Sequence, residues 1–373
     1  MHLSAHHPLV ADRTQDSRLV QAYLGRRPSV PPVWFMRQAG RSLPEYRALR
    51  ETSSMLDACL QPELAAEITM QPVRRHGVDA AIFFSDIVIP LLVVGLDVKI
   101  VAGRGPVFAS PVRTAVDIAR VTDIDPDTVI SRGGPIVEAV EQITALLAQE
   151  SERRGEPLPL IGFAGAPFTL AAYLVEGGPS KDHLAARGLI FRDPAAWEAL
   201  TGWLAEVTGR FLRLQLQAGA SAGQLFDSWA GSLAPEVYRT AALPASRRAV
   251  EIAREVTPPR EATIERIPLA HFGVGTGELL ADIATLGVDV VGLDHRVSIV
   301  DALMRMNAPV AVQGNLDPAL LFAPEPVWQE ALDRLLRQGR AASAHIVNLG
   351  HGVPPETDPD VLTAIVRRVH EAS

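Results

Sequence analysis

Short apolar runs alternate with longer amphipathic segments along most of the chain. Eight apolar runs end abruptly at polar or glycine residues, at positions 33–36, 80–84, 160–163, 223–226, 268–272, 290–293, 309–312 and 345–349. Runs that are apolar at consecutive positions are typical of strands buried on both faces. We therefore predict eight β-strands in these places.

The segments between the runs show the spacing of amphipathic helices. One example is IVEAVEQITALLAQE at 136–150, and the others lie at 197–217, 235–256, 279–286, 298–306 and 327–338. Proline or glycine marks several joins, as at Pro194 and Gly219. Alternating strands and helices predict a parallel sheet covered by helices. Eight such units favour a closed (β/α)8 TIM barrel over an open, doubly wound sheet.

The interval between positions 86 and 160 is too long for a single helix. Its segment LDVKIVAGRGPVF, at 96–108, predicts an inserted two-stranded β-ribbon, which a helical stretch follows. No Ser/Gly-rich linker and no repeat of fixed period divides the chain. We expect residues 1–16 to be disordered and residues 17–373 to form one barrel domain, with the active site at the C-terminal ends of its strands.

Composition and charge limit the class of protein. The chain has 373 residues, of which 47% are hydrophobic, and a net charge of −8, so neither nucleic acid nor an anionic membrane is an expected partner. The N-terminal residues lack the pattern of a secretory signal peptide, and Asp86, Pro90 and Asp97 interrupt the apolar stretch at 80–98. We therefore expect a cytoplasmic protein. The single cysteine, Cys59, can form neither an internal disulfide nor a multi-thiolate metal site.

Two arginines follow the first predicted strand, in the segment PVWFMRQAGRSLPEY. Arg37 ends the apolar run, and Arg41 follows across Gly40. A guanidinium keeps its charge, and its donors match the two oxygens of a carboxylate. Two of them at one strand end predict a site for a polycarboxylate, whereas the ordinary alternative is a pair of surface salt bridges.

Other polar side chains come at the ends of later strands, where a barrel gathers its functional groups. Asp86 lies within the apolar stretch FFSDIVIPLL, so its carboxylate needs a partner. The functional interpretation is that Asp86 accepts ligand N–H groups or stabilises a cationic intermediate. The ordinary alternative is that it caps a loop or pairs with an arginine. Tyr173, Ser228 and His351 follow the third, fourth and eighth strands. The ordinary alternative for Tyr173 is a core residue with a satisfied hydroxyl, and for His351 a loop side chain that bonds the backbone.

Motifs for cofactor or metal chemistry are absent from the sequence. The chain contains no Walker A motif, no GxSxG elbow and no HExxH. In GVGTGELL, at 273–280, Glu278 stands where a dinucleotide fingerprint needs glycine, and no histidine is placed locally to activate Ser228. We expect no cofactor and no metal.

The chain resembles the uroporphyrinogen decarboxylases in six ordered motifs: MRQAGRSLPEYR, FFSDIVIPL, GFAGAPFTLAAYLVEGG, FDSWAG, VQGNLDP and NLGHGVPPETDP. The resemblance extends from about residue 17 to residue 370. It implies a cofactor-free (β/α)8 enzyme, typically a homodimer with facing active-site clefts. It also implies that the enzyme removes the four acetate carboxyls of a small-molecule substrate, uroporphyrinogen III, to give coproporphyrinogen III and CO2.

The resemblance also implies roles for single residues. Asp86, in the FSD motif, falls on the family's central aspartate, which binds the pyrrole N–H groups of the macrocycle. Arg37 and Arg41 fall on arginines that hold substrate carboxylates, and Arg37 is implied to lie near the reacting acetate. Three further positions are implied to hydrogen-bond or orient carboxylate side chains: Tyr173, Ser228 and His351.

The chain departs from the family pattern at three positions outside these roles. Ser42 and His295 replace a common tyrosine and a common tryptophan, and Phe168 replaces a usual tryptophan. Two other functions stay open. A related methyltransferase needs zinc-binding thiolates, whereas Cys59 has no HxC companion. A non-catalytic tetrapyrrole carrier has no need for a carboxylate such as Asp86 at the macrocycle centre.

Decarboxylation of an acetate leaves a carbanion that needs an electron sink. Since no cofactor is expected, the substrate has to supply the sink, and a protonated pyrrole ring is able to accept the electrons. A carboxylate at Asp86 would stabilise that cationic ring and lower the barrier. The proton donor stays open, because arginine is a poor acid with a pKa above ~12.

Overall fold

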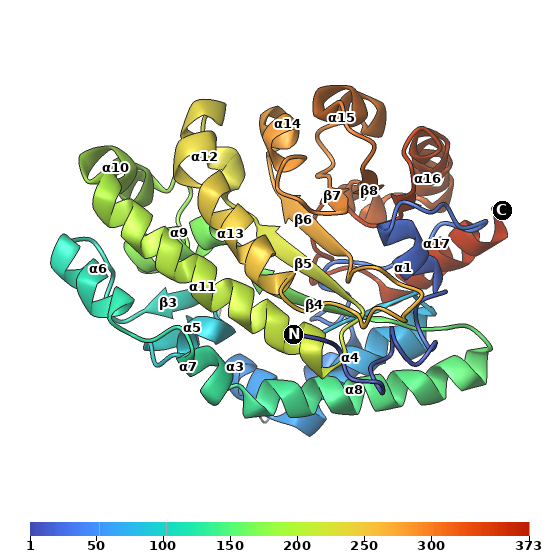
Figure 1. Cartoon of the computed structure of the whole chain (residues 1–373). Coiled ribbons are helices and arrows are strands. Elements are labelled where there is room, and N and C mark those ends of the chain that lie inside the picture. Colours follow the sequence, from blue (N-terminus) through green and yellow to red (C-terminus); the bar gives the residue numbers. More distant parts are fainter. Residues whose placement is uncertain (52, 102, 373) are drawn as a thin grey trace.

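A curled parallel sheet forms the centre of the computed structural model, which describes residues 1–51, 53–101 and 103–372. Helices surround the sheet (Figure 1). Its neighbouring strands pair in parallel, as the alternating pattern predicted. In the described residues the sheet has seven strands, in the order β1 (Ala81–Ile82), β4 (Leu160–Gly165), β5 (Ala222–Asp227), β6 (Leu269–Gly273), β7 (Val290–Gly292), β8 (Ala311–Gln313) and β9 (His345–Ile346).

The helices that were predicted between the strands are present. The longer ones are α4 (Pro62–His76), α8 (Gly134–Arg154), α9 (Pro167–Glu176), α10 (Leu184–Arg192), α11 (Pro194–Ala218), α13 (Leu243–Ala253), α15 (Ile299–Met306), α16 (Glu325–Gly339) and α17 (Pro359–Glu371). The shorter ones are α1 (Arg18–Tyr23), α2 (Pro44–Leu49), α3 (Met55–Leu60), α5 (Ile89–Val93), α6 (Ala115–Thr122), α7 (Thr128–Ser131), α12 (Pro235–Ala241) and α14 (Leu280–Ile283), with 3-10 turns η1 (Ala230–Ser232), η2 (Gly277–Leu279) and η3 (Pro318–Phe322).

Proline and glycine bound the long helices, as the sequence indicated. Helix α11 begins at Pro194, and the Asp193 side chain caps it by accepting a hydrogen bond from the Ala196 N–H at 3.1 Å. Helices α4 and α8 end at Gly77 and Gly155, whose φ angles of 70° and 71° suit glycine. These local signals set where each helix stops and the chain returns to the sheet.

The predicted strand at 33–36 is not a regular strand, and this prediction was wrong in detail. Val33 forms a parallel bridge with Val347, beyond β9, and its carbonyl accepts the Asp79 N–H at 2.9 Å, just before β1. The Trp34 N–H still donates to the Val347 carbonyl, at 3.2 Å, but side chains accept the next two N–H groups. The Gln38 Oε1 accepts the Phe35 N–H at 3.0 Å, and the Asn348 Oδ1 accepts the Met36 N–H, also at 3.0 Å.

The inserted ribbon is confirmed. Strands β2 (Val98–Val101) and β3 (Gly105–Phe108) pair in antiparallel fashion. Helices α6, α7 and α8 then lead to β4. Together with α5, which precedes the ribbon, the long interval before β4 therefore holds a ribbon and four helices in the described residues, without a second sheet domain.

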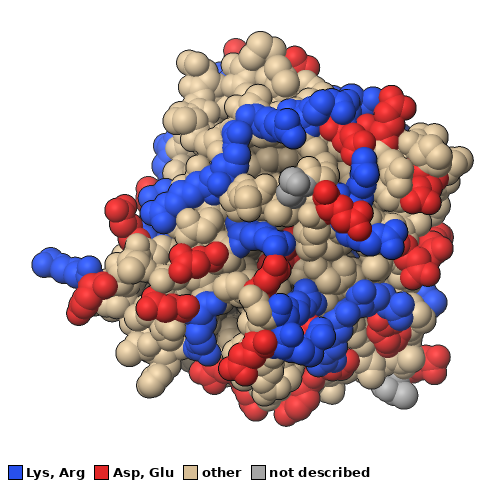
Figure 2. All heavy atoms as spheres, turned by 90° about the vertical axis from the view of Figure 1, so that its right-hand side faces the viewer, with Lys and Arg blue, Asp and Glu red and all other residues tan. Residues whose placement is uncertain are grey.

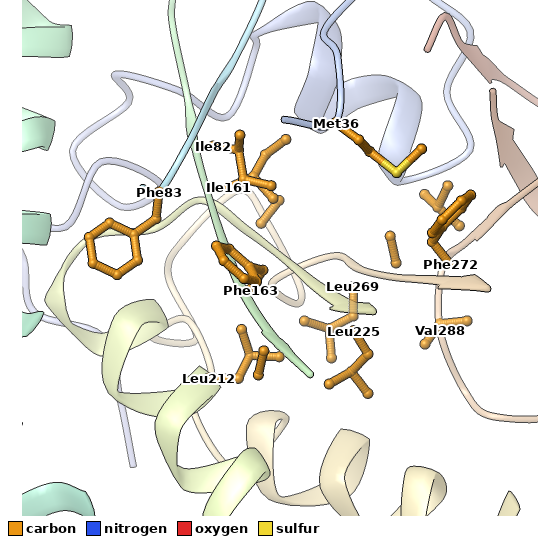
Figure 3. Packing of buried hydrophobic residues seen from close by; sticks show 14 of the residues in the cluster. Met36, Ile82, Phe83, Ile161, Phe163, Leu212, Leu225, Leu269, Phe272 and Val288 are labelled. Carbon is orange, nitrogen blue, oxygen red and sulfur yellow. The ribbon is translucent and has the colours of Figure 1, made fainter. Parts of the chain in front are cut away.

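The core gathers apolar side chains from segments that are far apart in the sequence. Met36, Ile161, Phe163 and Phe272 belong to one buried cluster (Figure 3). Phe226 contributes edge-to-face contacts to both Phe163 and Phe272, with ring centroids 5.4 and 6.2 Å apart. Strands that are apolar on both faces are thus covered on both faces, which explains their unbroken apolar runs.

Residues 1–16 are folded against the sheet and α11, in contrast to the disorder that we expected. Leu9 is fully buried, and His7 bonds through Nε2 to the Leu216 carbonyl at 2.9 Å. Thr14 bonds to the Ser221 hydroxyl at 2.8 Å. Burial lowers the pKa of His7 to about 4. Only tertiary contacts order this segment, because it has no helical or strand periodicity of its own. The assignment of residues 17–373 to one domain stays a prediction.

Asp79 joins three distant segments. Its carboxylate accepts the Val33 N–H at 2.8 Å and an Arg18 N–H at 3.1 Å, and it lies 2.9 Å from the His370 Nε2. Asp79→Ala would leave the Val33 N–H buried without a partner, so we expect the free energy of unfolding to fall by about 2–3 kcal/mol in a urea titration. Glu156→Ala is the control, because Glu156 is the exposed partner of the same arginine, and it should cost less than about 1 kcal/mol. Equal losses in the two variants would contradict this role for Asp79.

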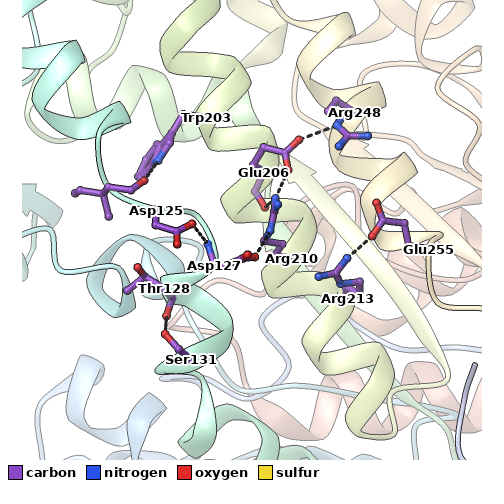
Figure 4. A network of polar contacts seen from close by, with 11 residues as sticks. Asp125, Asp127, Thr128, Ser131, Trp203, Glu206, Arg210, Arg213, Arg248 and Glu255 are labelled. Atoms are coloured by element: carbon purple, nitrogen blue, oxygen red, sulfur yellow. Dashed lines mark hydrogen bonds and ion pairs between the residues drawn. The ribbon is translucent and has the colours of Figure 1, made fainter. Parts of the chain in front are cut away.

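Ion pairs between helices lie mainly on the surface. Glu206 and Arg210 of α11 pair with each other, Asp127 binds Arg210 at 2.7 Å, and Glu206 binds Arg248 of α13 at 2.7 Å (Figure 4). Acidic and basic side chains lie side by side on the face to which α16 and α17 contribute (Figure 2). There Arg368 pairs with Asp333 at 2.9 Å. Such pairs contribute about 0–1 kcal/mol each.

Candidate active site

Asp86 follows β1, in a loop that leads into α5. It is partly buried, and its Oδ1 accepts the Val88 N–H at 3.0 Å. Burial raises the pKa of the Asp86 carboxyl above its usual range, while the Val88 N–H and the positive charge of Arg37 oppose this rise. Among the described residues, no hydrogen bond to the second oxygen of Asp86 is present.

Arg37 is exposed and lies in an unusual backbone conformation. Its φ angle is 61°, which costs a residue with a side chain about 1–2 kcal/mol. A Cβ added at Gly352 would come within 2.5 Å of the Arg37 Cδ, so the glycine makes room for the arginine side chain. Among the described residues, neither Arg37 nor Arg41 forms an ion pair, and the alternative of surface salt bridges has no support there.

Two buried amides hold the Arg37 loop, and the sequence analysis missed both. Gln38 accepts the Phe35 N–H and donates to the Ala80 carbonyl at 3.1 Å. Asn348 accepts both the Met36 and the Leu349 N–H groups, at 3.0 and 2.8 Å. Gln38 follows Arg37 in RQAGR, and Asn348 precedes His351 in NLGHG. This position near predicted site residues was the sequence signal that could have identified them. The Asn348 side chain connects the loop that carries Arg37 with the loop that carries His351, and the Gln38 side chain ties the Arg37 loop to Ala80.

Tyr173, in α9, is stacked on Trp229, with ring centroids 3.9 Å apart. His183 stacks on Trp229 as well, at 4.2 Å. Burial raises the pKa of Tyr173 to about 12, the negative charge of Asp86 adds to the rise, and the positive charge of Arg37 opposes it. The hydroxyl is therefore a neutral hydrogen-bond donor at neutral pH. Trp229 and His183 were not predicted, and only the folded chain brings them together.

Ser228 comes directly after β5, in a turn fixed by a fully buried carboxylate. Thr169 donates to Asp227 at 2.7 Å and accepts the Trp229 N–H at 3.2 Å. The fully buried His271 lies 3.6 Å from the other oxygen of Asp227. These contacts anchor the residues on either side of Ser228, whose own side chain is half-buried.

His351 is exposed between two glycines. Its Nδ1 accepts the Gly352 N–H at 2.8 Å, so the neutral ring carries its proton on Nε2 and presents it outward. Burial lowers the pKa of His351, and the charges of Arg37 and His295 lower it further. The ordinary alternative, a bond to the backbone, thus accounts for one nitrogen and leaves the other free to donate.

The structure brings some predicted residues together and leaves others apart. Arg37 lies close enough to Asp86, Tyr173 and His351 for its positive charge to act on the pKa of each of these three side chains. No described contact joins Arg41 to this group: its side chain is exposed, and its carbonyl accepts from Arg47 at 2.7 Å.

The positions that depart from the family pattern have different environments. Phe168 is fully buried against Trp197, with ring centroids 5.9 Å apart, so its difference concerns packing. Ser42 is also buried. His295 lies after β7, near His351, and thus differs from the pattern beside the site.

The described ranges contain neither a metal-binding cluster nor a membrane-spanning helix. Those residues contain no group of three or more His, Cys, Asp and Glu side chains arranged to hold a metal ion. Cys59 is buried, and burial together with the charge of Asp86 raises the pKa of its thiol. No helix in this part of the chain has the length and apolar character needed to cross a membrane.

Comparisons with known proteins identify the family of this chain. The family model described as uroporphyrinogen decarboxylase (URO-D) matches residues 14–372. The chain is 55% identical to a uroporphyrinogen decarboxylase of Leifsonia xyli subsp. xyli over 98% of this chain and 97% of that protein, and 54% identical to one of Arthrobacter sp. over 97% and 99%. A solved methyltransferase from Methanosarcina mazei shares the fold, with a TM-score of 0.75 at 17% identity over 96% of this chain and 99% of the other. The chain belongs to the uroporphyrinogen decarboxylase family.

Proposed function

We propose that this protein removes the four acetate carboxyls of uroporphyrinogen III to give coproporphyrinogen III and CO2, as a carboxy-lyase of tetrapyrrole biosynthesis. Family membership and full-length relatives of that name support the proposal. The observation that carries it is that the partly buried Asp86 carboxylate lies within the electrostatic reach of Arg37, whose guanidinium has no ion-pair partner among the described residues.

The chemistry follows from this arrangement. A proton adds to the pyrrole ring, the bond between the acetate methylene and its carboxylate breaks, and the electron pair moves into the cationic ring. CO2 leaves, and a second proton converts the methylene to a methyl group. The proton first added to the ring then leaves and restores the neutral pyrrole, so one proton is taken up in total. Asp86 would accept the pyrrole N–H groups and stabilise the cationic ring, because its field acts more strongly on that intermediate than on the neutral ring.

The other site residues would bind the side chains of the macrocycle. Arg37 and Arg41 would hold carboxylates, since guanidinium–carboxylate bonds are charge-assisted. Tyr173 would donate from a hydroxyl that stays protonated, and Ser228 and His351 would donate from the ends of β5 and β9. No residue is assigned as the proton donor.

The proposal is tested by incubating the pure, metal-stripped protein with uroporphyrinogen III under anaerobic conditions. The oxidised porphyrins are then separated by chromatography. A ladder of partly decarboxylated intermediates that ends in coproporphyrin supports the proposal. Tight binding without turnover would indicate a carrier, and the absence of both would reject this substrate.

The remaining expectations about architecture and assembly form part of the proposal. We propose that the irregular segment around Val33 closes the curled sheet into a (β/α)8 barrel. The parallel bridge of Val33 to Val347 and the hydrogen bond from the Asp79 N–H to the Val33 carbonyl support this. We also propose that the protein is a homodimer in the cytoplasm and does not bind nucleic acid. Exposed apolar side chains such as Leu184 and Phe191 of α10 are candidates for the contact between subunits. Light scattering of the pure protein would give its mass in solution.

Arg41→Ala is expected to weaken substrate binding without unfolding the protein. The exposed side chain makes no described ion pair, so the melting temperature should stay within about a degree, because surface substitutions of this kind are nearly neutral. Loss of a charge-assisted contact should raise KM about tenfold. Steady-state kinetics and thermal unfolding measure both. A large loss of melting temperature with unchanged KM would assign Arg41 to the fold instead.

A further inference from the structure

The loop Gly350–Gly352 lies between two basic segments. A Cβ at Gly352 would come within 2.5 Å of the Arg37 Cδ, and a Cβ at Gly350 would come within 2.7 Å of the His295 Cα. His351 stands between these two glycines. The loop that carries His351 is therefore flanked by Arg37 and by the turn after β7, which carries His295 and Arg296.

The turn after β7 is held rigidly. The Asp294 carboxylate is 3% exposed and accepts the Gly275 N–H at 2.5 Å and the Arg296 N–H at 3.0 Å. The Asn315 Nδ2 donates to the carbonyls of Asp294 and Val297, both at 2.6 Å. The backbone of Arg296 is therefore fixed, and its side chain starts from a defined place.

The Arg296 guanidinium remains available to a ligand. Its side chain is 62% exposed, and its nearest anion, the Asp294 carboxylate, is 3.8 Å away and already accepts two backbone N–H groups. The positive charge of Arg296 acts on His351 in the same direction as those of Arg37 and His295. Three basic side chains thus surround one imidazole that donates from Nε2.

We infer that Arg296, together with His351 and His295, forms a second carboxylate subsite that binds a propionate side chain of the tetrapyrrole. The inference rests on the proposed function. Arg37, on the far side of His351, is proposed to hold the reacting acetate region, so a group beyond His351 would meet a different side chain of the macrocycle. Propionates are not decarboxylated, and the same carboxylate is therefore present in substrate and product.

A contact between Arg296 and a propionate predicts a specific kinetic pattern. An interaction that is equal in the ground state, the transition state and the product changes KM and product affinity but leaves kcat unaltered. Arg296→Ala should raise KM for uroporphyrinogen III about tenfold and weaken the binding of coproporphyrinogen III by a similar factor, with kcat within about twofold of the parent. Arg296→Lys keeps the charge and should recover part of the loss.

Arg120→Ala is the matched control. Arg120, in α6, is also 62% exposed and also lies near a single aspartate, at 3.7 Å, but it is not among the basic groups around His351. The control should leave KM and product affinity unchanged. Thermal unfolding of both variants checks that the fold is intact.

The kinetics and an anaerobic equilibrium dialysis with coproporphyrinogen III separate the outcomes. If the parent protein is active and Arg296→Ala behaves like Arg120→Ala, the subsite is rejected while the proposed function stands. An equal loss of kcat and kcat/KM at constant KM would also reject it, because the residue would then act in the transition state. A parent protein that neither converts uroporphyrinogen III nor binds coproporphyrinogen III would overturn the proposed function and the subsite together.

Discussion

Asp86→Asn is expected to lower turnover about 10³-fold, or about 4 kcal/mol of transition-state stabilisation, while the protein stays folded. The neutral amide has almost the same shape as the carboxylate, and its oxygen can still accept the Val88 N–H that Asp86 now accepts at 3.0 Å. What it loses is the negative charge that would stabilise a protonated pyrrole ring. Single-turnover and steady-state assays with uroporphyrinogen III measure the loss.

The effect of Asp86→Asn on stability has a defined sign. Burial raises the pKa of Asp86 in the folded protein, so the folded chain binds more protons than the unfolded chain between the usual and the raised value. Stability therefore falls as pH rises through that window. The amide does not ionise, so the melting temperature of Asp86→Asn at neutral pH should equal or exceed that of the parent.

Asp97→Asn provides the control for this charge change. Asp97 is exposed in the same part of the chain, and its backbone carbonyl, which the substitution keeps, accepts the Ala109 N–H. Its activity should match the parent. Full activity of Asp86→Asn with an unaltered pH profile would falsify the role of the carboxylate.

Arg37→Gly is expected to lower kcat/KM about 100-fold without a loss of stability. Removal of the guanidinium abolishes charge-assisted bonds worth about 1.5–3 kcal/mol to a substrate carboxylate. The backbone at this position has a φ angle of 61°, which glycine adopts freely and alanine does not. Arg37→Ala should therefore lose the same activity but be about 1 kcal/mol less stable than Arg37→Gly.

A urea titration and steady-state kinetics of the two Arg37 variants test this pair of expectations. Equal activity losses with different stabilities would separate the role of the guanidinium from that of the backbone. Retention of normal kcat/KM in either variant would remove Arg37 from the site. Equal stabilities would mean that the left-handed conformation relaxes once the side chain is gone.

The order of strands and helices could be predicted because it depends on local patterns. Apolar runs buried on both faces, and helices bounded by residues such as Pro194, Gly77 and Gly155, are encoded within a few positions of each other. The ribbon at 98–108 was predicted for the same reason. The strand at 33–36 failed because Gln38 and Asn348 supply hydrogen bonds in place of a neighbouring strand, and Asn348 is more than three hundred residues away.

The N-terminal segment also depends on contacts that the local sequence does not encode. Its sequence has no periodicity, yet Leu9 is buried and His7 and Thr14 bond to Leu216 and Ser221. Such contacts join residues roughly two hundred positions apart, and no local sequence pattern predicts them. The segment is ordered because it packs against one end of α11 and β5, which come together only in the folded chain.

For the site, the sequence by itself determined which candidate chemical groups follow the apolar runs along the chain: Arg37, Asp86, Tyr173, Ser228 and His351. Tertiary structure alone decided how they are supported. It stacked Tyr173 and His183 on Trp229, and it placed His351 between Arg37 and the turn of His295 and Arg296. The physical reason is that side-chain identity and strand ends are local, whereas charge, burial and stacking depend on distances across the sheet, which exist only once the chain has folded.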